Sequence, residues 1–127
     1  MVHGLWASVS GLVAVGAAAR LRVPSLVHVA GGELVAMPEL GYGGALGRGG
    51  RWITRTCLSR AGTVTVASEW LADQVRAGGH RIDAVVPLGA GPEWFAAAAP
   101  AEGQPRFVQV ASLNRIKDHA TALEALA

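Results

Sequence analysis

Two short segments of this chain carry side chains and turns that could bind a ligand. The first is Val27–Glu33, where an apolar strand pattern runs into a glycine pair and ends on an acid. The second is Val110–His119, which reads as a strand, a polar turn and the start of a helix beside Lys117. Ligands of α/β proteins bind in loops that leave the carboxyl ends of strands, so both segments are candidate binding loops.

Lys117 is the best candidate for a phosphate ligand. The free N–H groups and the dipole at a helix N-terminus favour an anion, and a neighbouring lysine adds a positive charge. Arg115 stands two residues earlier and could assist, although strand-like alternation could equally point it to solvent. The alternative for Lys117 is a solvated lysine in front of a helix.

Three other polar residues have both a functional and a structural interpretation. Glu33 accepts hydrogen bonds from hydroxyl groups of a ligand, or from backbone N–H groups that shape the loop after Gly31 and Gly32, or it is a loop acid in water. His3 lies on the floor of a cleft, or it is a mobile residue near a terminus. Ser68 either touches a ligand or caps the helix that follows it, and capping already explains it.

Composition excludes several function classes. With 51% hydrophobic residues among 127, the chain has the composition of a globular domain rather than a disordered one. A net charge of +2 and 6% aromatic residues argue against nucleic acid as a partner. Cys57 is the single cysteine, which excludes an internal disulfide and favours a reducing cytosol. The histidines show no metal-ligand spacing, so we predict no metal and no cofactor.

The apolar run Leu12–Ala19 is too short to span a bilayer, which needs about 20 residues. A secretory signal is the alternative, because small residues follow at Gly16–Ala19. However, the first ten residues contain no lysine or arginine, and a signal peptide needs a positive start. We therefore interpret the run as a buried helix.

Strand and helix patterns alternate along the chain with short connections. Residues 1–6 read as the end of a strand or the loop after it. We expect strands near 25–29, 63–67, 82–86 and 106–111, and helices near 10–21, 51–60, 69–77 and 118–127. A small-residue stretch with two prolines over 96–105 reads as a linker. This alternation predicts an α/β fold with a mostly parallel, Rossmann-like sheet.

Five segments resemble, in order, motifs of the retaining glycosyltransferases of family 4. They cover nearly the whole chain, although none is specific alone. They are His3-Gly4-Leu5-Trp6, Val27–Glu33 with Gly41-Tyr42-Gly43, Thr65-Val66-Ala67-Ser68, Val86-Pro87-Leu88-Gly89-Ala90 with Trp94-Phe95, and Val110–Asp118. Four positions depart from the family pattern: Ala30, Leu88, Gly91 and Ser112.

The resemblance implies a GT-B fold, in which two Rossmann-like domains face each other across a cleft. Residues 1–95 would be part of the acceptor-side domain, 96–105 a linker, and 106–127 the first β-α unit of the donor-side domain. It also implies that Lys117, with Arg115, binds the diphosphate of a nucleotide-sugar donor. The acceptor-side loop would then comprise Gly31, Gly32, Glu33 and His3.

Family members extend beyond both ends of this sequence, so the resemblance implies a fragment that lacks the donor-sugar site. We expect no catalytic residue to be identifiable here and no sugar transfer by this chain alone. Two alternatives are a small α/β ligand-binding module without catalysis and a decayed reading frame. We expect a cytoplasmic protein.

Arginines dominate one stretch of the sequence around Trp52. Arg48, Arg51, Arg55 and Arg60 occur there without an acidic residue among them. A basic amphipathic helix can bind the anionic inner surface of a membrane. An ordinary solvated helix face is the alternative, and the sequence alone favours it.

Overall fold

The computed structural model describes residues 1–92 and 107–126. The predicted linker over 96–105 and the motif residues Trp94-Phe95 lie outside this range. The chain divides into two compact units, Met1–Leu88 and Gly89–Ala127. Each unit is described by itself.

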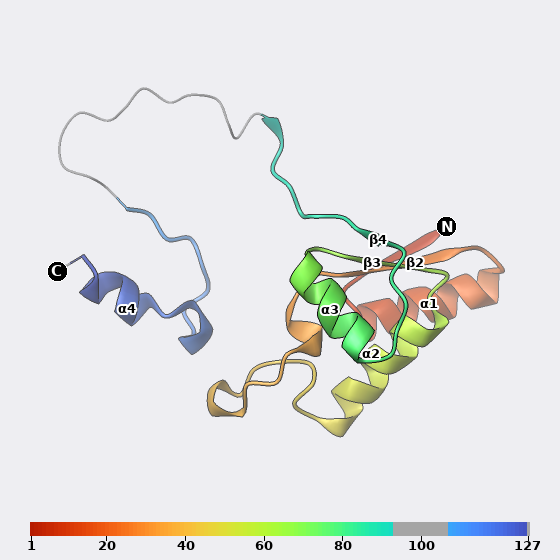
Figure 1. The fold of residues 1–127 in the computed structure, drawn as a ribbon, viewed down its shortest axis with the longest axis horizontal. Helices are drawn as coiled ribbons and strands as arrows, with labels where there is room; N and C mark the ends of the chain where they lie inside the picture. Colours follow the sequence, from red (N-terminus) through yellow and green to blue (C-terminus); the bar gives the residue numbers. More distant parts are fainter. Residues whose placement is uncertain (93–106, 127) are drawn as a thin grey trace. The chain divides into compact units, whose positions relative to one another are not determined.

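Strands and helices alternate through the first unit (Figure 1). In chain order they are β1 (Val2–Leu5), α1 (Val9–Leu21), β2 (Ser25–Val29), the 3-10 helices η1 (Gly32–Leu34) and η2 (Pro38–Leu40), α2 (Arg48–Arg60), β3 (Thr63–Val66), α3 (Glu69–Ala77) and β4 (Ala84–Val85). Residues 1–6, which the sequence left between strand and loop, thus contain a strand. Among the described residues, no helix is long and apolar enough to span a membrane.

The four strands form one sheet in the order β1-β2-β3-β4, and every neighbouring pair is parallel. This confirms the predicted α/β fold with a parallel sheet. Gly4 aligns with Val27, and Val27 with Val64, across the three longer strands. Because all strands run the same way, their carboxyl ends meet at one edge, where the loops after β1, β2 and β3 gather.

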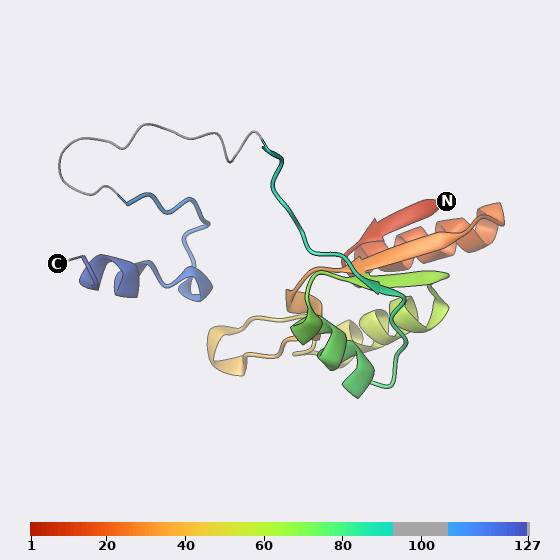
Figure 2. The same cartoon turned by 45° about the horizontal axis from the view of Figure 1, so that its top comes forward.

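The hydrophobic core lies on one face of this sheet. Val27, Val29, Val64 and Val66 are fully buried there. They join one cluster with buried residues of all three helices: Val15 from α1, Cys57 and Leu58 from α2, and Leu71, Ala72 and Val75 from α3. Figure 1 shows α1, α2 and α3 together on the same side of the sheet, and Figure 2 shows the same three helices from a second direction. Successive strand residues alternate between faces, so His28 and Thr65 lie on the other face.

Helix α2 begins three residues before the predicted start at 51. The predicted helix near 51–60 left out Gly49 and Gly50, and glycine is unfavourable within helices. The structure places both in the first turn, where Gly47 precedes the helix and its carbonyl accepts from Arg51 N at 3.1 Å. The backbone of Gly50 also passes so close to Gly44 that a side chain would not fit. Tertiary packing therefore overrides local propensity here.

The second unit contains the 3-10 helix η4 (Arg115–Lys117) and the short helix α4 (His119–Glu124). The predicted strand over 106–111 is wrong for its described residues, 107–111, which form no strand. A strand needs a partner with which to form a ladder, and the described residues of this unit contain no other strand.

Candidate functional site

A cavity opens at the carboxyl edge of the sheet, between the loops that follow β1 and β2. Its volume is about 350 Å³. The residues that line it are Trp6, Ser8, Gly32, Glu33, Tyr42, Gly43 and Gly44. The predicted loop residues Gly32 and Glu33 therefore meet at one cavity. Gly31 borders them, because its N–H donates to Glu33.

Glu33 is buried, with 6% of its surface exposed. Its Oε1 accepts hydrogen bonds from Ala7 N at 3.1 Å and from Ala30 N at 3.4 Å. Its Oε2 accepts from Gly31 N at 2.9 Å. One carboxylate thus ties the loop after β1 to the loop after β2. Of the three interpretations that the sequence left open, a loop acid in water is wrong, and the loop-shaping role is the observed one.

The loop after β1 is held from several directions. Ala7 O accepts a hydrogen bond from Thr54 Oγ1 of α2 at 2.9 Å, while Ala7 N donates to Glu33. Trp6 N donates to His28 O at 2.8 Å. Trp6 has a φ of 68°, in the left-handed region that non-glycine residues seldom occupy. The surrounding bonds therefore fix an otherwise unfavourable backbone, and half of the Trp6 side chain stays exposed at the cavity.

The far wall of the cavity depends on glycine. Gly43 has a φ of 118°, and a Cβ atom there would overlap the carbonyl group of Val35. A Cβ atom at Gly44 would lie 2.7 Å from Glu33 O. The Tyr42 hydroxyl comes close to the Cα hydrogens of Gly32. Only residues without side chains allow this wall to approach Glu33 so closely.

His3 does not line the cavity. It lies in β1 opposite Leu26 of β2 and is exposed. The structure therefore does not bring His3 together with the glycine-glycine-glutamate loop. Its role in binding stays a prediction.

His28, on the sheet face opposite the core, is 5% exposed. Its Nδ1 lies 2.8 Å from Thr65 Oγ1, and its Nε2 is buried with no hydrogen-bond partner among the described residues. Burial lowers the pKa of His28 below its ordinary value, nearby His3 lowers it further, and Glu33 raises it. The neutral imidazole is thus the favoured form in the folded protein.

This environment predicts a pH-dependent stability. Below the ordinary histidine pKa of 6.5, His28 is protonated to a greater extent in the unfolded chain than in the folded chain. The free energy of unfolding should therefore fall as the pH drops below 6.5, by up to about 1.4 kcal/mol per pH unit. Urea titrations between about pH 7.5 and about pH 5, a range that includes the ordinary histidine pKa, measure this slope on the wild type and on His28→Gln.

His28→Gln should show a smaller slope than the wild type over that range. An unchanged slope in His28→Gln would assign the pH dependence to other groups.

Ser68 occupies the N-cap position of α3. Its Oγ accepts a hydrogen bond from Leu71 N at 3.3 Å, which satisfies one free N–H of the first turn. This is the structural role that the sequence suggested. A contact between Ser68 and a ligand stays a prediction.

Lys117 and Arg115 lie in η4, and both are exposed. Asn114 Oδ1 organises this turn by accepting hydrogen bonds from Ile116 N and Lys117 N, both at 3.2 Å. The first turn of α4 is already capped, because Asp118 Oδ1 accepts from Thr121 N at 3.4 Å. The lysine therefore stands before a short helix whose N-terminus carries a carboxylate of its own, which is less favourable for an anion than the sequence suggested.

A model of the glycosyl transferase 4-like domain matches residues 1–91 of the chain. The chain belongs to this family. No curated protein and no solved structure gave a significant match. The matched range contains the whole parallel sheet and the cavity at its carboxyl edge, so the glycosyl transferase 4-like domain is the part of the chain that holds the candidate site.

Sequence reasoning missed several residues that build the site in this domain. Tyr42 was predicted only as part of a motif, and Thr54 was not predicted as a site residue. Tyr42 lines the cavity, and Thr54 holds the β1–α1 loop. The pair Gly43-Gly44 beside an aromatic residue was the available signal for a close-packed wall. Nothing in the sequence marks Thr54, which lies in α2, 47 residues after the Ala7 carbonyl that it supports.

Proposed function

We propose that this chain is part of a glycosyltransferase that moves a sugar from a nucleotide-sugar donor to an acceptor bound in the cavity of residues 1–88. The observation that carries the proposal is the coincidence of the family match with a preorganised cavity at the carboxyl edge of a parallel sheet. Small-molecule sites in proteins are concave clefts of this kind.

The chemistry of the cavity suits a saccharide or glycoside acceptor. Trp6 and Tyr42 provide aromatic surface, against which the apolar face of a sugar ring can pack. Ser8 provides a hydroxyl group. Glu33 contributes indirectly, since its carboxylate already accepts three backbone N–H groups that shape the loop.

For the donor, we propose that Lys117, with Arg115, contacts the diphosphate. Support comes from their exposed positions in a turn before a helix and from the positive charge that a departing nucleoside diphosphate requires. Transfer needs donor and acceptor held together in one geometry. We therefore propose that the chain by itself binds ligands without transferring a sugar. We also propose that the protein acts in the cytoplasm.

The test is a set of titrations of the purified chain with saccharides and with nucleoside diphosphates, followed by NMR, alongside a sugar-transfer assay. We expect Trp6→Ala to weaken saccharide binding about tenfold, because it removes the aromatic surface. Lys117→Ala should leave saccharide binding unchanged and weaken nucleoside diphosphate binding about tenfold. Trp70→Ala is the matched control, since Trp70 is an exposed tryptophan on α3 that does not line the cavity.

Equal saccharide binding by Trp6→Ala and Trp70→Ala would remove the acceptor cavity from the proposal. Measurable transfer by the purified chain would overturn the proposed inactivity. Saccharide binding without any nucleotide binding would favour the non-catalytic ligand-binding module.

A further inference from the structure

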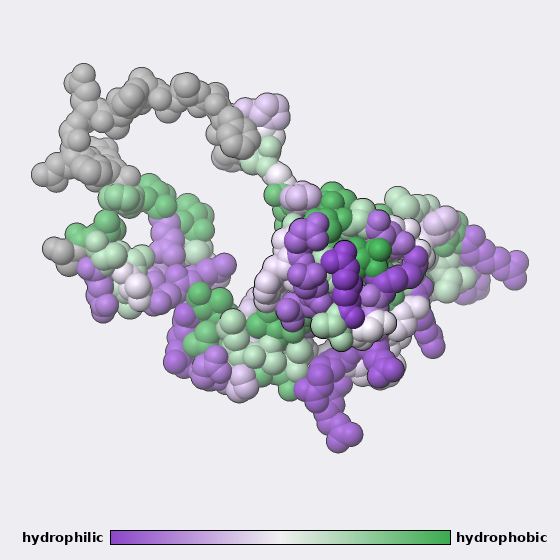
Figure 3. All heavy atoms as spheres, in the orientation of Figure 1, coloured by the Kyte–Doolittle hydropathy of each residue, from purple (hydrophilic) through white to green (hydrophobic). Residues whose placement is uncertain are grey.

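The outward side of the α1–α2 layer is basic and contains no acid. Neither helix has an aspartate or a glutamate, whereas α2 carries four arginines: Arg48, Arg51, Arg55 and Arg60. Helix α3, by contrast, carries Glu69 and Asp73. In Figure 3, hydrophilic side chains project outward near the end of α1 at the right and near the start of α2 at the bottom.

Three of these charges have no acidic neighbour. Within residues 1–92 and 107–126, no carboxylate lies within ion-pair distance of Arg48, Arg55 or Arg60, and all three are exposed. Arg76 on α3 is different, because it pairs with Asp73 at 3.1 Å. The unpaired arginines of α2 are therefore available to an anionic partner.

Apolar side chains stand beside these arginines. Trp52 is 61% exposed, and it follows Arg48 by four residues and precedes Arg55 by three along α2. On α1, Val9 and Val13 are 62% and 65% exposed, one helical turn apart. Because α1 and α2 cover the same face of the sheet (Figure 2), their outward sides form one surface.

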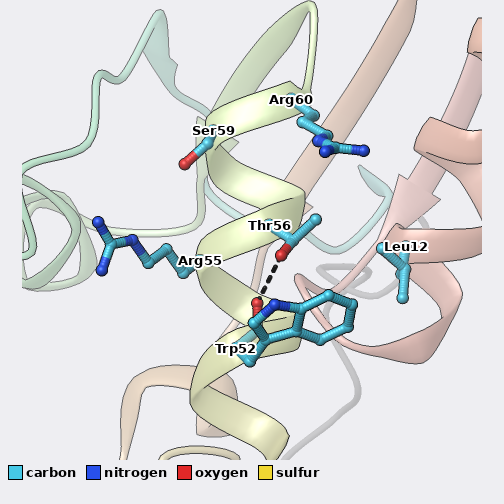
Figure 4. A pocket seen from close by; sticks show the side chains of 6 residues that line it. All are labelled: Leu12, Trp52, Arg55, Thr56, Ser59 and Arg60. Carbon is cyan, nitrogen blue, oxygen red and sulfur yellow. Dashed lines mark hydrogen bonds between the residues drawn. The ribbon is translucent and has the colours of Figure 1, made fainter.

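A groove joins the two helices on this surface. Its volume is about 410 Å³, and it is lined by Leu12, Trp52, Arg55, Thr56, Ser59 and Arg60. Figure 4 shows the indole ring of Trp52 turned toward Leu12, with Arg60 on the same side and Arg55 on the other side of the helix. Trp52 and Leu12 thus form an apolar floor of the groove, and the guanidinium groups of Arg55 and Arg60 lie on either side of it.

We propose that this surface, the α1–α2 face (Val9, Val13, Arg48, Trp52, Arg55 and Arg60), docks on an anionic lipid bilayer. The arginines would contact lipid phosphates while Trp52 and the valines enter the boundary between headgroups and acyl chains, where tryptophan is favoured. A nucleic acid or an acidic protein would match the charge but leave the exposed valines of α1 without a role.

The sequence favoured a solvated helix face because it showed only the arginines of α2. The structure adds the exposed valines of α1 beside them, which the sequence could not place on the same surface. The inference does not depend on sugar transfer, and it assigns this face of the domain to a membrane surface.

The experiment is co-sedimentation of the full chain with vesicles of phosphatidylcholine, alone or mixed with phosphatidylglycerol. We expect binding to the mixed vesicles only, weakened by salt. Arg55→Gln should lower the partition coefficient about fivefold. Trp52→Ala should lower it on the order of tenfold, since it removes the inserted ring.

Two variants on α3 serve as matched controls. Trp70→Ala removes a tryptophan that is 58% exposed, and Arg76→Gln removes an exposed arginine of an acidic helix. Both should bind mixed vesicles as the wild type does. Circular dichroism of each variant establishes that the fold is retained.

Absence of vesicle binding, or equal binding to neutral and anionic vesicles, would overturn the proposal. So would equal losses in Trp52→Ala and Trp70→Ala. Retention on single-stranded DNA without vesicle binding would assign the arginines to a nucleic acid instead. Saccharide binding is measured separately, so failure here leaves the proposed glycosyltransferase role intact.

Discussion

Glu33→Ala is expected to lower the free energy of unfolding by about 3 kcal/mol. The substitution removes the acceptor of three backbone N–H groups, of which Ala7 N is buried. A buried donor left without a partner costs about 1–3 kcal/mol, and bonds to a charged acceptor are stronger than neutral ones. The loss of these bonds also frees the β1–α1 loop from the loop after β2. Urea denaturation followed by circular dichroism measures the change.

Two companion variants sharpen this test. Glu33→Gln keeps one carbonyl oxygen as an acceptor, so it should lose less stability than Glu33→Ala. Glu124→Ala alters an exposed acid of α4 and should change stability by less than about 0.5 kcal/mol. If Glu33→Ala were as stable as Glu124→Ala, the carboxylate would not organise the loops.

Glu33 also shows where sequence reasoning reaches its limit. The position of an acid after two glycines at a strand end predicted a binding loop, and the structure places that loop at a cavity. The sequence could not choose between a ligand contact and a structural one. The deciding bond comes from Ala7, which is 26 residues away in the chain and adjacent only after β1 and β2 pair.

Strand prediction succeeded where a partner strand is present. The β-branched run Thr63–Val66 and the apolar run Ser25–Val29 both pair in parallel, as expected from alternating elements. The similar run at 107–111 has no such partner among the described residues, and it forms no strand. β-propensity expresses how well a residue fits into a sheet. A run of residues with high β-propensity therefore does not form a strand where no neighbouring strand is present.

The contact between α1 and β1 could not be predicted either, because it depends on two glycines that read as helix or strand breakers. A Cβ atom at Gly4 would lie 2.9 Å from Ala14 Cβ and 3.0 Å from Gly11 Cα. Glycine therefore allows the helix to approach the strand closely. Sequence alone shows only that glycine weakens both elements.

Gly11→Ala and Gly16→Ala, the same change in one helix, should accordingly have opposite effects. At Gly11 the new Cβ atom would lie 2.5 Å from Trp6 O, so the helix or the cavity loop must move, at a cost of about 2–3 kcal/mol. At Gly16 nothing lies within 4 Å, and alanine should stabilise the helix by about 0.5–1 kcal/mol. Urea denaturation of both variants measures the difference. Because Trp6 lines the cavity, Gly11→Ala should also weaken saccharide binding, whereas Gly16→Ala should not. Equal stability of the two variants would show that α1 does not pack on the loop after β1 as described.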